Sequence, residues 1–248
     1  MKDYGITIYG KHALMEAVIN MPQAIDRVYL TSRDDQKLND LLKKTGIKPT
    51  IVGVDSLPKN VDPTANHQGV VALVNLGKLV LDYGEFIAKF EVSNNKCLVI
   101  LSELQDPQNV GAIIRSAAAF GIAGVLIPEH NQVPVTDTVV KVSAGMAFRV
   151  PLVAIGNINN TIRDLKERGF WIYGLSEDST QPLAQEKFKA PTVFVLGNEA
   201  RGMRQKTTEL CDILLKIPMN PGCESLNVAA SAAVALYSWS VHHQEALR

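Results

Sequence analysis

The chain has 248 residues, of which 46% are hydrophobic and 20% charged, a globular composition that excludes disordered and collagen-like classes. Its 25 Lys and Arg residues balance 25 Asp and Glu residues, so net charge gives no reason to expect a nucleic-acid partner, although it does not exclude local basic patches. No apolar stretch is long enough to cross a membrane, and "MKDYGITIYG" lacks the apolar segment of a secretory signal. Because the three scattered cysteines form neither a disulfide framework nor a metal motif, we expect a reduced, cytoplasmic protein.

The first block of the chain alternates helix and strand signals. "GKHALMEAVINM" has apolar residues at helical spacing, and "DDQKLNDLLKKTG" begins with acidic residues and ends with basic residues and glycine, as helices do. "DRVYLTS", "TIVGV" and "GVVALVNL" are short β-rich runs typical of strands. We predict a compact α/β domain over residues 1–76, followed by a linker over residues 77–93.

The second block, residues 94–248, alternates strands and helices throughout. "CLVILSEL", "AGVLIP", "FWIYGLS", "PTVFVLG" and "CDILLKIPM" predict strands, whereas "VGAIIRSAAAFG", "INNTIRDLKERG" and the small-residue run from Val228 onward predict helices. This alternation indicates a mostly parallel sheet with helices on both faces. Ligands of such sheets bind at the carboxyl ends of the strands. Three polar loops, "QDPQN", "NEARG" and "NPGCESLN", each follow a predicted strand, so we expect the site where they meet.

Several common catalytic motifs are absent from the sequence. There is no G-x-G-x-x-G after a strand, no G-x-x-x-x-G-K-[ST], no G-x-S-x-G elbow and no His/Cys cluster with metal spacing. The five histidines are scattered, and we expect each to be a surface or structural residue. These absences argue against the usual phosphate cradles and metal hydrolases.

The segments "DPQNVGAIIRSAAAFG", "VLGNEARGM" and "IPMNPGCESLNVAASAA" resemble, in order and relative position, the three motifs of the SpoU-type (SPOUT superfamily, TrmH-like) RNA ribose 2′-O-methyltransferases. The first block resembles the family's ribosomal-protein-like RNA substrate-binding domain through "IYGKHALMEAV" and "NHQGVVALV". The two-domain arrangement is most similar to the bacterial branch that methylates a guanosine in 23S ribosomal RNA. The resemblance implies S-adenosylmethionine as cofactor, no metal, an RNA partner, a homodimer and an alpha/beta knot in the C-terminal domain.

The resemblance also implies which residues form the site. The catalytic set matches Asn109, Arg115, Glu199, Ser225 and Asn227. The cofactor-binding set, which acts largely through backbone, matches Gly197, Ile217 and Leu226. Because a guanidinium normally stays protonated, we expect Arg115 to clamp an RNA phosphate and orient the hydroxyl rather than to act as the base.

Each of these residues also has a purely structural interpretation. Arg115 alone would be a surface residue of an amphipathic helix, Glu199 an acid at a helix start, and Ser225 a helix N-cap. The chain departs from the family at Ala200, where Gly commonly follows the glutamate, and at Ser102, where many members have Asp. The leading hypothesis is 2′-O-methylation of 23S ribosomal RNA. The alternatives are the same chemistry on transfer RNA, a catalytically silent RNA-binding protein, or a nucleotide-binding α/β protein unrelated to RNA.

Overall fold

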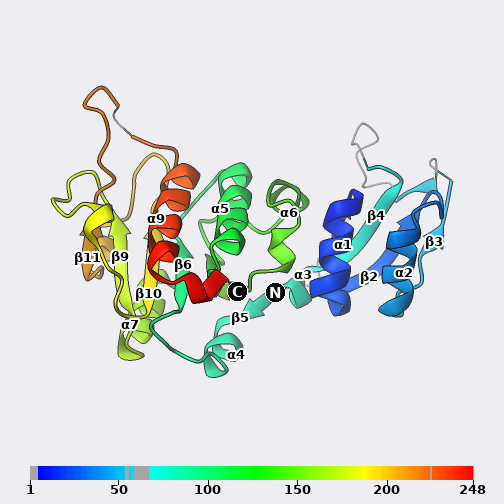
Figure 1. Ribbon diagram of the computed structural model, residues 1–248, viewed down its shortest axis with the longest axis horizontal. Helices are drawn as coiled ribbons and strands as arrows, with labels where there is room; N and C mark the ends of the chain where they lie inside the picture. Colours follow the sequence, from blue (N-terminus) through cyan, green and yellow to red (C-terminus); the bar gives the residue numbers. More distant parts are fainter. Residues whose placement is uncertain (1–4, 54–55, 59–66, 224, 248) are drawn as a thin grey trace.

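The computed structural model describes residues 5–53, 56–58, 67–223 and 225–247. Two α/β parts lie side by side in Figure 1, and we call them the smaller and the larger domain. The smaller domain contains a four-stranded sheet with strand order β1-β4-β2-β3. The larger domain contains a seven-stranded sheet with strand order β11-β9-β10-β6-β7-β8-β5.

The smaller sheet consists of β1 (Gly5–Tyr9), β2 (Ile25–Leu30), β3 (Thr50–Ile51) and β4 (Val70–Asn75). β4 pairs antiparallel with β1 and β2, and β3 pairs in parallel with β2. Helices α1 (Lys11–Asn20) and α2 (Gln36–Lys44) pack against it through buried residues such as Leu14 and Leu38. The α2 helix begins where the Asp35 carboxylate accepts a hydrogen bond from the Leu38 amide, at 3.0 Å, as the acidic start of its sequence predicts.

The larger sheet consists of β5 (Val80–Asp82), β6 (Cys97–Leu101), β7 (Gly124–Pro128), β8 (Leu152–Ile155), β9 (Trp171–Leu175), β10 (Thr192–Leu196) and β11 (Ile213–Leu215). All neighbouring strands pair in parallel, which confirms the predicted mostly parallel sheet. The remaining helices are α3 (Leu76–Leu79), α4 (Tyr83–Ala88), α5 (Pro107–Ala119), α6 (Asp137–Val142), α7 (Ile158–Glu167), α8 (Gln205–Thr208) and α9 (Val228–His242). Within the described ranges, no helix is long and apolar enough to cross a membrane.

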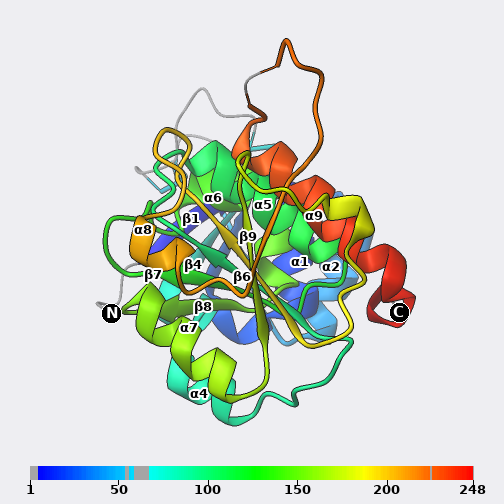
Figure 2. The ribbon, with the colours of Figure 1, turned by 90° about the vertical axis from the view of Figure 1, so that its left-hand side faces the viewer.

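Helices cover both faces of the larger sheet. Figure 2 shows α5, α6 and α9 on one side of it and α4 and α7 on the other. Along β6, Val99 and Leu101 pack in the core shared with α5 and α9, whereas Leu98 and Ile100 pack in the core shared with α4 and α7. Successive side chains of a strand point to opposite faces, so a strand covered on both faces is apolar along its whole length. All five residues of β6 are accordingly buried.

Some strands lie where the sequence predicted none. β5 falls inside residues 77–93, the expected linker, and pairs with β8 as the edge strand of the larger sheet. This part of the expected linker therefore belongs to the larger domain. β5 has only three residues and pairs on one side, so it leaves no periodic pattern in the sequence. β1 and β8 were likewise not predicted.

The two domains are joined by an ion pair between α1 and the segment after α6. Arg149 Nε donates to Glu16 Oε2 at 2.5 Å and its Nη2 donates to Glu16 Oε1 at 2.9 Å. The Glu16 side chain is only 7% exposed, and Asn20 Nδ2 donates to the same carboxylate at 3.1 Å. Nearby, Lys141 Nζ lies 5.2 Å from the ring centre of Tyr9. A bidentate charge-assisted pair of this kind fixes orientation as well as distance between its elements.

Candidate active site

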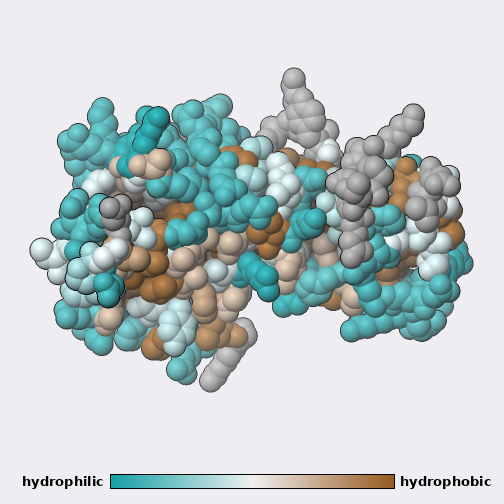
Figure 3. All heavy atoms as spheres, turned by 90° about the horizontal axis from the view of Figure 1, so that it is seen from above, coloured by the Kyte–Doolittle hydropathy of each residue, from teal (hydrophilic) through white to brown (hydrophobic). Residues whose placement is uncertain are grey.

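Three polar loops gather at the carboxyl edge of the larger sheet. They are residues 102–106 after β6, residues 197–204 after β10 and residues 216–227 after β11. β6 and β10 are neighbours, and β11 lies beside β9 on the other side of β10. The loop 216–227 is the orange segment at the upper left of Figure 1. Viewed from above, this part of the molecule exposes brown apolar residues among teal polar ones (Figure 3).

One chain of side-chain hydrogen bonds connects the first turn of α5 with the loops after β10 and β11. Asn227 Nδ2 donates to Asn109 Oδ1 at 2.9 Å, and Asn109 Nδ2 donates to Glu199 Oε1 at 2.9 Å. Asn109 is 7% exposed and lies in the first turn of α5. That turn is set by Asp106, whose carboxylate accepts from the Gln108 amide at 2.8 Å, and by Pro107 at the first helical position. Three of the five expected catalytic residues thus meet, and we call this chain the amide relay.

Asn227 also caps the last helix. Its Oδ1 accepts hydrogen bonds from the amides of Ala229 at 2.8 Å and Ala230 at 3.3 Å. The structural interpretation of Ser225 as the N-cap is therefore wrong, because Ser225 lies two residues before the cap and is exposed. Since one Asn227 side chain serves both α9 and Asn109, the start of α9 and the relay are held in one position.

Glu199 is held by a tight turn rather than by a helix start. The backbone of Asn198 and Gly202 exchanges two hydrogen bonds of 2.9 Å, and Asn198 Oδ1 accepts from the amides of Ala200 and Arg201. Gly202 has φ +64°, a left-handed conformation that favours glycine. Glu199 lies inside this turn, six residues before α8 begins, so the interpretation of Glu199 as a helix-start acid is wrong.

A second connection, between the loops after β6 and β10, was not predicted from the sequence. Glu103 follows β6 with φ +64°, and its carboxylate forms an ion pair with Arg204, with Nη2 to Oε1 at 2.7 Å and Nε to Oε2 at 3.0 Å. The Glu103 carbonyl accepts from Asn198 Nδ2 at 2.7 Å. These contacts brace the turn that carries Glu199. No motif pointed to them, since glutamate rarely adopts a left-handed conformation and gives no local signal there.

A cleft of about 790 Å³ opens between the loops. Among the residues that line it are all three expected cofactor-binding residues and three of the expected catalytic ones, namely Gly197, Ile217, Leu226, Glu199, Ser225 and Asn227. Leu175 and Met219 add apolar surface, and Glu177 and Asp178 add carboxylates from the loop after β9. The cleft therefore combines apolar walls with a few convergent polar groups, as ligand sites do.

Gly197 has no room for a side chain. An added Cβ would lie 2.5 Å from the carbonyl carbon of Gly202 and 2.6 Å from the nitrogen of Met203. The resemblance assigns this glycine to cofactor binding, but what approaches it most closely here is the chain's own backbone. Glycine at this position therefore closes the turn that carries Glu199.

Arg115 stands apart from the relay. It is exposed on α5, and among the described residues it has neither a hydrogen bond nor an ion pair. Six helical residues correspond to about 9 Å along the axis and to a rotation of about 120° away from Asn109. The six-residue spacing therefore places Arg115 and Asn109 on different faces of the helix.

Other reactive side chains lie outside the cleft. Burial raises the pKa of the Cys211 thiol to about 12 and that of Cys97 well above its usual value, so both stay protonated. His243 is buried, with its ring nitrogens 3.0 Å from Asn95 Oδ1 and from the Phe188 carbonyl, which is a structural role. In the part of the chain that the structure describes, no group of three His, Cys, Asp or Glu residues could hold a metal ion. Glu224 lies outside the described residues.

Comparisons with known proteins match both domains. The model of the SpoU rRNA Methylase family matches residues 96–237, and that of RNA 2′-O ribose methyltransferase substrate binding matches residues 7–78. The chain is 35% identical over 242 residues to the 23S rRNA (guanosine-2′-O-)-methyltransferase RlmB of Nitrosomonas europaea, covering 96% of this chain and 92% of that protein. It is 36% identical over 239 residues to the protein of the same name from Vibrio vulnificus, covering 93% and 94%.

A solved structure agrees with the fold. The SpoU methyltransferase AviRb from Streptomyces viridochromogenes, in complex with the cofactor AdoMet, superposes with a TM-score of 0.80 and 22% identity. The superposition covers 97% of this chain and 91% of that one, so the likeness includes both domains and their arrangement in one chain.

Proposed function

Because this chain belongs to the SpoU rRNA methylase family, we propose that it transfers a methyl group from S-adenosylmethionine to the ribose 2′-hydroxyl of a guanosine in 23S ribosomal RNA. The observation that carries the proposal is the amide relay at the rim of the cleft, in a chain that aligns over nearly its whole length with 23S rRNA guanosine methyltransferases. A catalytically silent protein would have no need to keep Asn109, Glu199 and Asn227 in mutual contact.

The cleft fits S-adenosylmethionine in its chemistry. Leu175, Ile217 and Met219 offer apolar surface for an adenine ring, and Glu177 and Asp178 offer carboxylates for the cofactor's cationic groups. Gly197 and Leu226 bring backbone groups to the same cleft, as the family's cofactor-binding residues do. When bound, the cofactor supplies a methyl group on a sulfonium, which is a good leaving group by itself.

The chain's own residues then have to position the ribose and remove one proton. The 2′-oxygen forms a bond to the methyl carbon while the carbon–sulfur bond breaks and the hydroxyl proton leaves. Glu199 Oε1 is occupied by Asn109, whereas Oε2 has no hydrogen-bond partner among the residues that the structure describes. We assign Oε2 as the acceptor of the hydroxyl proton, with the relay and the Glu103–Arg204 pair fixing the carboxylate.

Arg115 has a different role in this proposal. Its exposure and its distance along α5 from Asn109 suit a residue that meets the RNA from outside the cleft. A guanidinium binds a phosphate through parallel hydrogen bonds and keeps its charge. Arg115 therefore clamps a phosphate of the RNA, and Ser225, at the cleft rim, contacts the bound substrate.

The substrate is tested by mapping methyl groups. Purified protein, S-adenosylmethionine and unmodified 23S ribosomal RNA are expected to yield one ribose-methylated guanosine, located by mass spectrometry of RNA fragments. Transfer RNA is the parallel substrate. Methylation of transfer RNA alone would overturn the ribosomal assignment, and methylation of neither RNA would overturn the activity.

The role of Glu199 is tested by Glu199→Gln. Glutamine keeps an acceptor for Asn109 Nδ2 but loses the negative charge, so S-adenosylmethionine binding should persist while methyl transfer falls by at least 100-fold, as expected for loss of a general base (about 10²–10⁴). Calorimetry measures the first quantity and a single-turnover assay the second. Turnover within a few-fold of the wild type would exclude Glu199 as the proton acceptor.

We infer in addition that the chain is a knotted homodimer in the cytoplasm, as the resemblance implies. An apolar stripe on α9 supports the dimer: Val234 is 41% exposed, Tyr237 58% and Val241 47%, at helical spacing along one face. Three free cysteines suit a reducing compartment. Light scattering on Tyr237→Glu should report a monomer where the wild type is a dimer, and a monomeric wild type would contradict the inference.

A further inference from the structure

One positive charge inside the active-site cleft has no part in the proposed proton transfer. Three carboxylates line the cleft, those of Glu177, Asp178 and Glu199. Arg201 is the one cationic side chain among the described residues that line it. Arg115, which the motifs assign to the reaction, does not line the cleft. The cleft therefore combines three negative charges with a single positive charge, which lies two residues after Glu199.

The turn that carries Glu199 holds Arg201 by its backbone and leaves its side chain free. The Arg201 amide donates to Asn198 Oδ1 at 3.2 Å, which fixes the start of the side chain. The guanidinium has neither a hydrogen bond nor an ion pair among the residues that the structure describes, and Arg201 is exposed. The side chain can therefore meet a ligand without breaking a contact of this kind.

The backbone of this turn has few donors left for an anion. The amides of Asn198 and Gly202 donate to each other's carbonyl groups at 2.9 Å, and the Ala200 amide donates to Asn198 Oδ1 at 3.0 Å. Backbone amides bind an anion where several unpaired ones converge, which these do not. An anion beside Glu199 therefore depends on the Arg201 guanidinium, which offers five N–H donors in a fixed fork.

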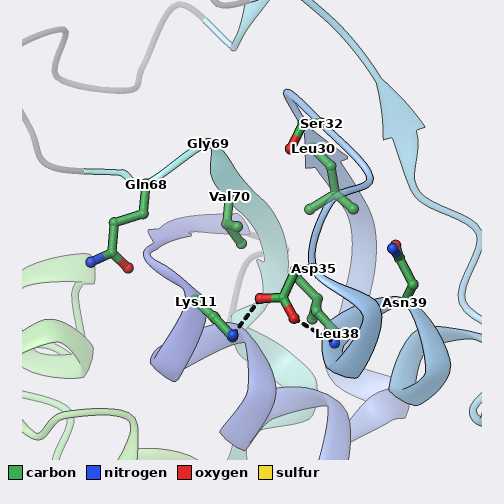
Figure 4. A pocket seen from close by; sticks show the side chains of 9 residues that line it. All are labelled: Lys11, Leu30, Ser32, Asp35, Leu38, Asn39, Gln68, Gly69 and Val70. Carbon is green, nitrogen blue, oxygen red and sulfur yellow. Dashed lines mark hydrogen bonds and ion pairs between the residues drawn. The ribbon is translucent and has the colours of Figure 1, made fainter.

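Two other basic side chains near a cavity are already paired. Arg204, three residues after Arg201, forms an ion pair with Glu103, with Nη2 to Oε1 at 2.7 Å. In the smaller domain, Lys11 lies at a cavity of about 350 Å³ and forms an ion pair with Asp35 (Figure 4). A phosphate bound to either cation would lie against the carboxylate of its partner, and like charges repel. Arg201 differs because no described carboxylate is paired with it.

The methyl acceptor brings an anion to the place where Arg201 lies. In RNA, the ribose carbon that bears the 2′-hydroxyl is bonded to the carbon that bears the 3′-phosphate. That phosphate therefore enters the cleft together with the oxygen that reacts beside Glu199. The three carboxylates repel it, and such repulsion is stronger in a cleft than in open water. A cation two residues from Glu199 offsets this repulsion.

We propose that Arg201 binds the 3′-phosphate of the nucleotide that is methylated and so admits this nucleotide to the cleft. The inference rests on the proposed function, because it assigns a further residue to the same reaction. Arg115, outside the cleft, then meets a different phosphate of the RNA. The cofactor's carboxylate is the other anion of the reaction, but it shares a carbon with the amine that Glu177 and Asp178 attract, in the loop after β9.

The test measures methylation of unmodified 23S ribosomal RNA by the full chain at several salt concentrations. Arg201→Ala should raise the KM for RNA about 10- to 30-fold, the effect of losing hydrogen bonds between charged groups. The slope of log(kcat/KM) against log[salt] should become shallower by about 0.7, the share of one phosphate of single-stranded RNA. The kcat and the Kd for S-adenosylmethionine should stay at their wild-type values, because the interaction is made before and during the reaction alike.

Two further variants separate the charge of Arg201 from a structural role. Arg201→Lys keeps the positive charge, so it should keep the wild-type salt slope and lose only part of the affinity for RNA, since lysine lacks the guanidinium fork. Arg163→Ala is the matched control, because Arg163 is exposed on α7, on the opposite side of the larger sheet from α5 and α9 (Figure 2). It should change neither the KM nor the slope. Thermal melting of Arg201→Ala should match that of the wild type.

The outcomes separate this inference from the function on which it rests. If the wild type fails to methylate 23S ribosomal RNA, the proposed function is overturned. If the wild type is active and Arg201→Ala keeps its KM for RNA, or raises it without changing the salt slope, the phosphate contact alone is overturned. A raised Kd for S-adenosylmethionine with an unchanged KM for RNA would assign Arg201 to the cofactor's carboxylate and would also overturn the contact.

Discussion

Replacing Asn109 with alanine removes the side chain that joins α5 to the loops after β10 and β11. Asn109 makes two hydrogen bonds of 2.9 Å, one to Glu199 and one from Asn227, and is 7% exposed. Each partner left without its hydrogen bond costs about 1–3 kcal/mol when water cannot replace it. Both partners line the cleft, where water has some access, so we expect about 2–3 kcal/mol for the pair. If the relay positions Glu199 in the transition state, this loss lowers kcat about 30- to 150-fold.

Asn109→Asp separates the two halves of the relay. Aspartate keeps an acceptor for Asn227 Nδ2 but places a second carboxylate beside Glu199, where the native distance is 2.9 Å. Two carboxylates this close raise the pKa of one of them, so they share a proton at low pH and repel each other at high pH. The activity of Asn109→Asp, relative to that of the wild type, should therefore rise as the pH falls. Single-turnover methyl transfer between pH 5.5 and 8.5 measures this ratio.

The control for stability is Asn157→Ala. Asn157 caps α7 by accepting a hydrogen bond from the Asn160 amide at 3.0 Å, and it does not line the cleft. Removing this cap should lower the free energy of unfolding by about 1 kcal/mol. The kcat of Asn157→Ala should equal that of the wild type. A kcat for Asn109→Ala within about threefold of the wild type (less than about 1 kcal/mol), with S-adenosylmethionine binding intact, would refute the reasoning, because the relay would then be structural only.

Two further predictions concern the domain junction and the alkaline limit of stability. Arg149→Ala leaves the Glu16 carboxylate buried with Asn20 as its side-chain donor, so the free energy of unfolding should fall by about 1–3 kcal/mol. The KM for RNA should rise more than the KM for S-adenosylmethionine, because the pair joins the two domains. A double-mutant cycle with Glu16→Gln that shows no coupling energy would contradict this prediction. Tyr83 donates to Asp164, and burial raises the pKa of its phenol above the unfolded value of about 10. The stabilisation that the protonated phenol gives to the fold is therefore present below pH 10 and is lost at higher pH. Chemical denaturation should show that the free energy of unfolding falls less steeply above pH 10 in Tyr83→Phe than in the wild type, and equal slopes would exclude Tyr83 as a cause.

The sequence predicted five of the seven strands of the larger sheet and missed two, β5 at its edge and β8 between β7 and β5. β6 and β10 are continuous apolar runs because both of their neighbours are strands and both of their faces are covered. β5 pairs on one side only and has three residues, so propensity alone cannot separate it from a linker. The same contrast holds for β3, a two-residue edge strand inside the longer predicted run "TIVGV".

The site was predicted unevenly for a similar reason. Asn109, Glu199 and Asn227 stand in motifs whose order the family fixes, and the structure brings them into contact. Glu103 and Arg204 are 101 residues apart, and nothing local indicates their ion pair. Arg115 is the reverse case, because a motif assigns it to the reaction but the geometry of α5 places it on a different face of the helix from Asn109. Motifs specify which residues matter, whereas the contacts between distant loops follow only from the folded chain.

The active-site cleft and the part of the chain that matches the substrate-binding model lie in different domains, so the spacing between them depends on how those domains are joined. The junction is a bidentate ion pair with a buried carboxylate, and at Gly145 beside it, where φ is +80°, an added Cβ would make a tight contact of 3.1 Å with the Glu16 side chain. A junction fixed in this way holds the smaller domain and the cleft at a constant spacing. We expect RNA bound to the smaller domain, which matches the substrate-binding model, to present to Glu199 the nucleotide that lies at that spacing.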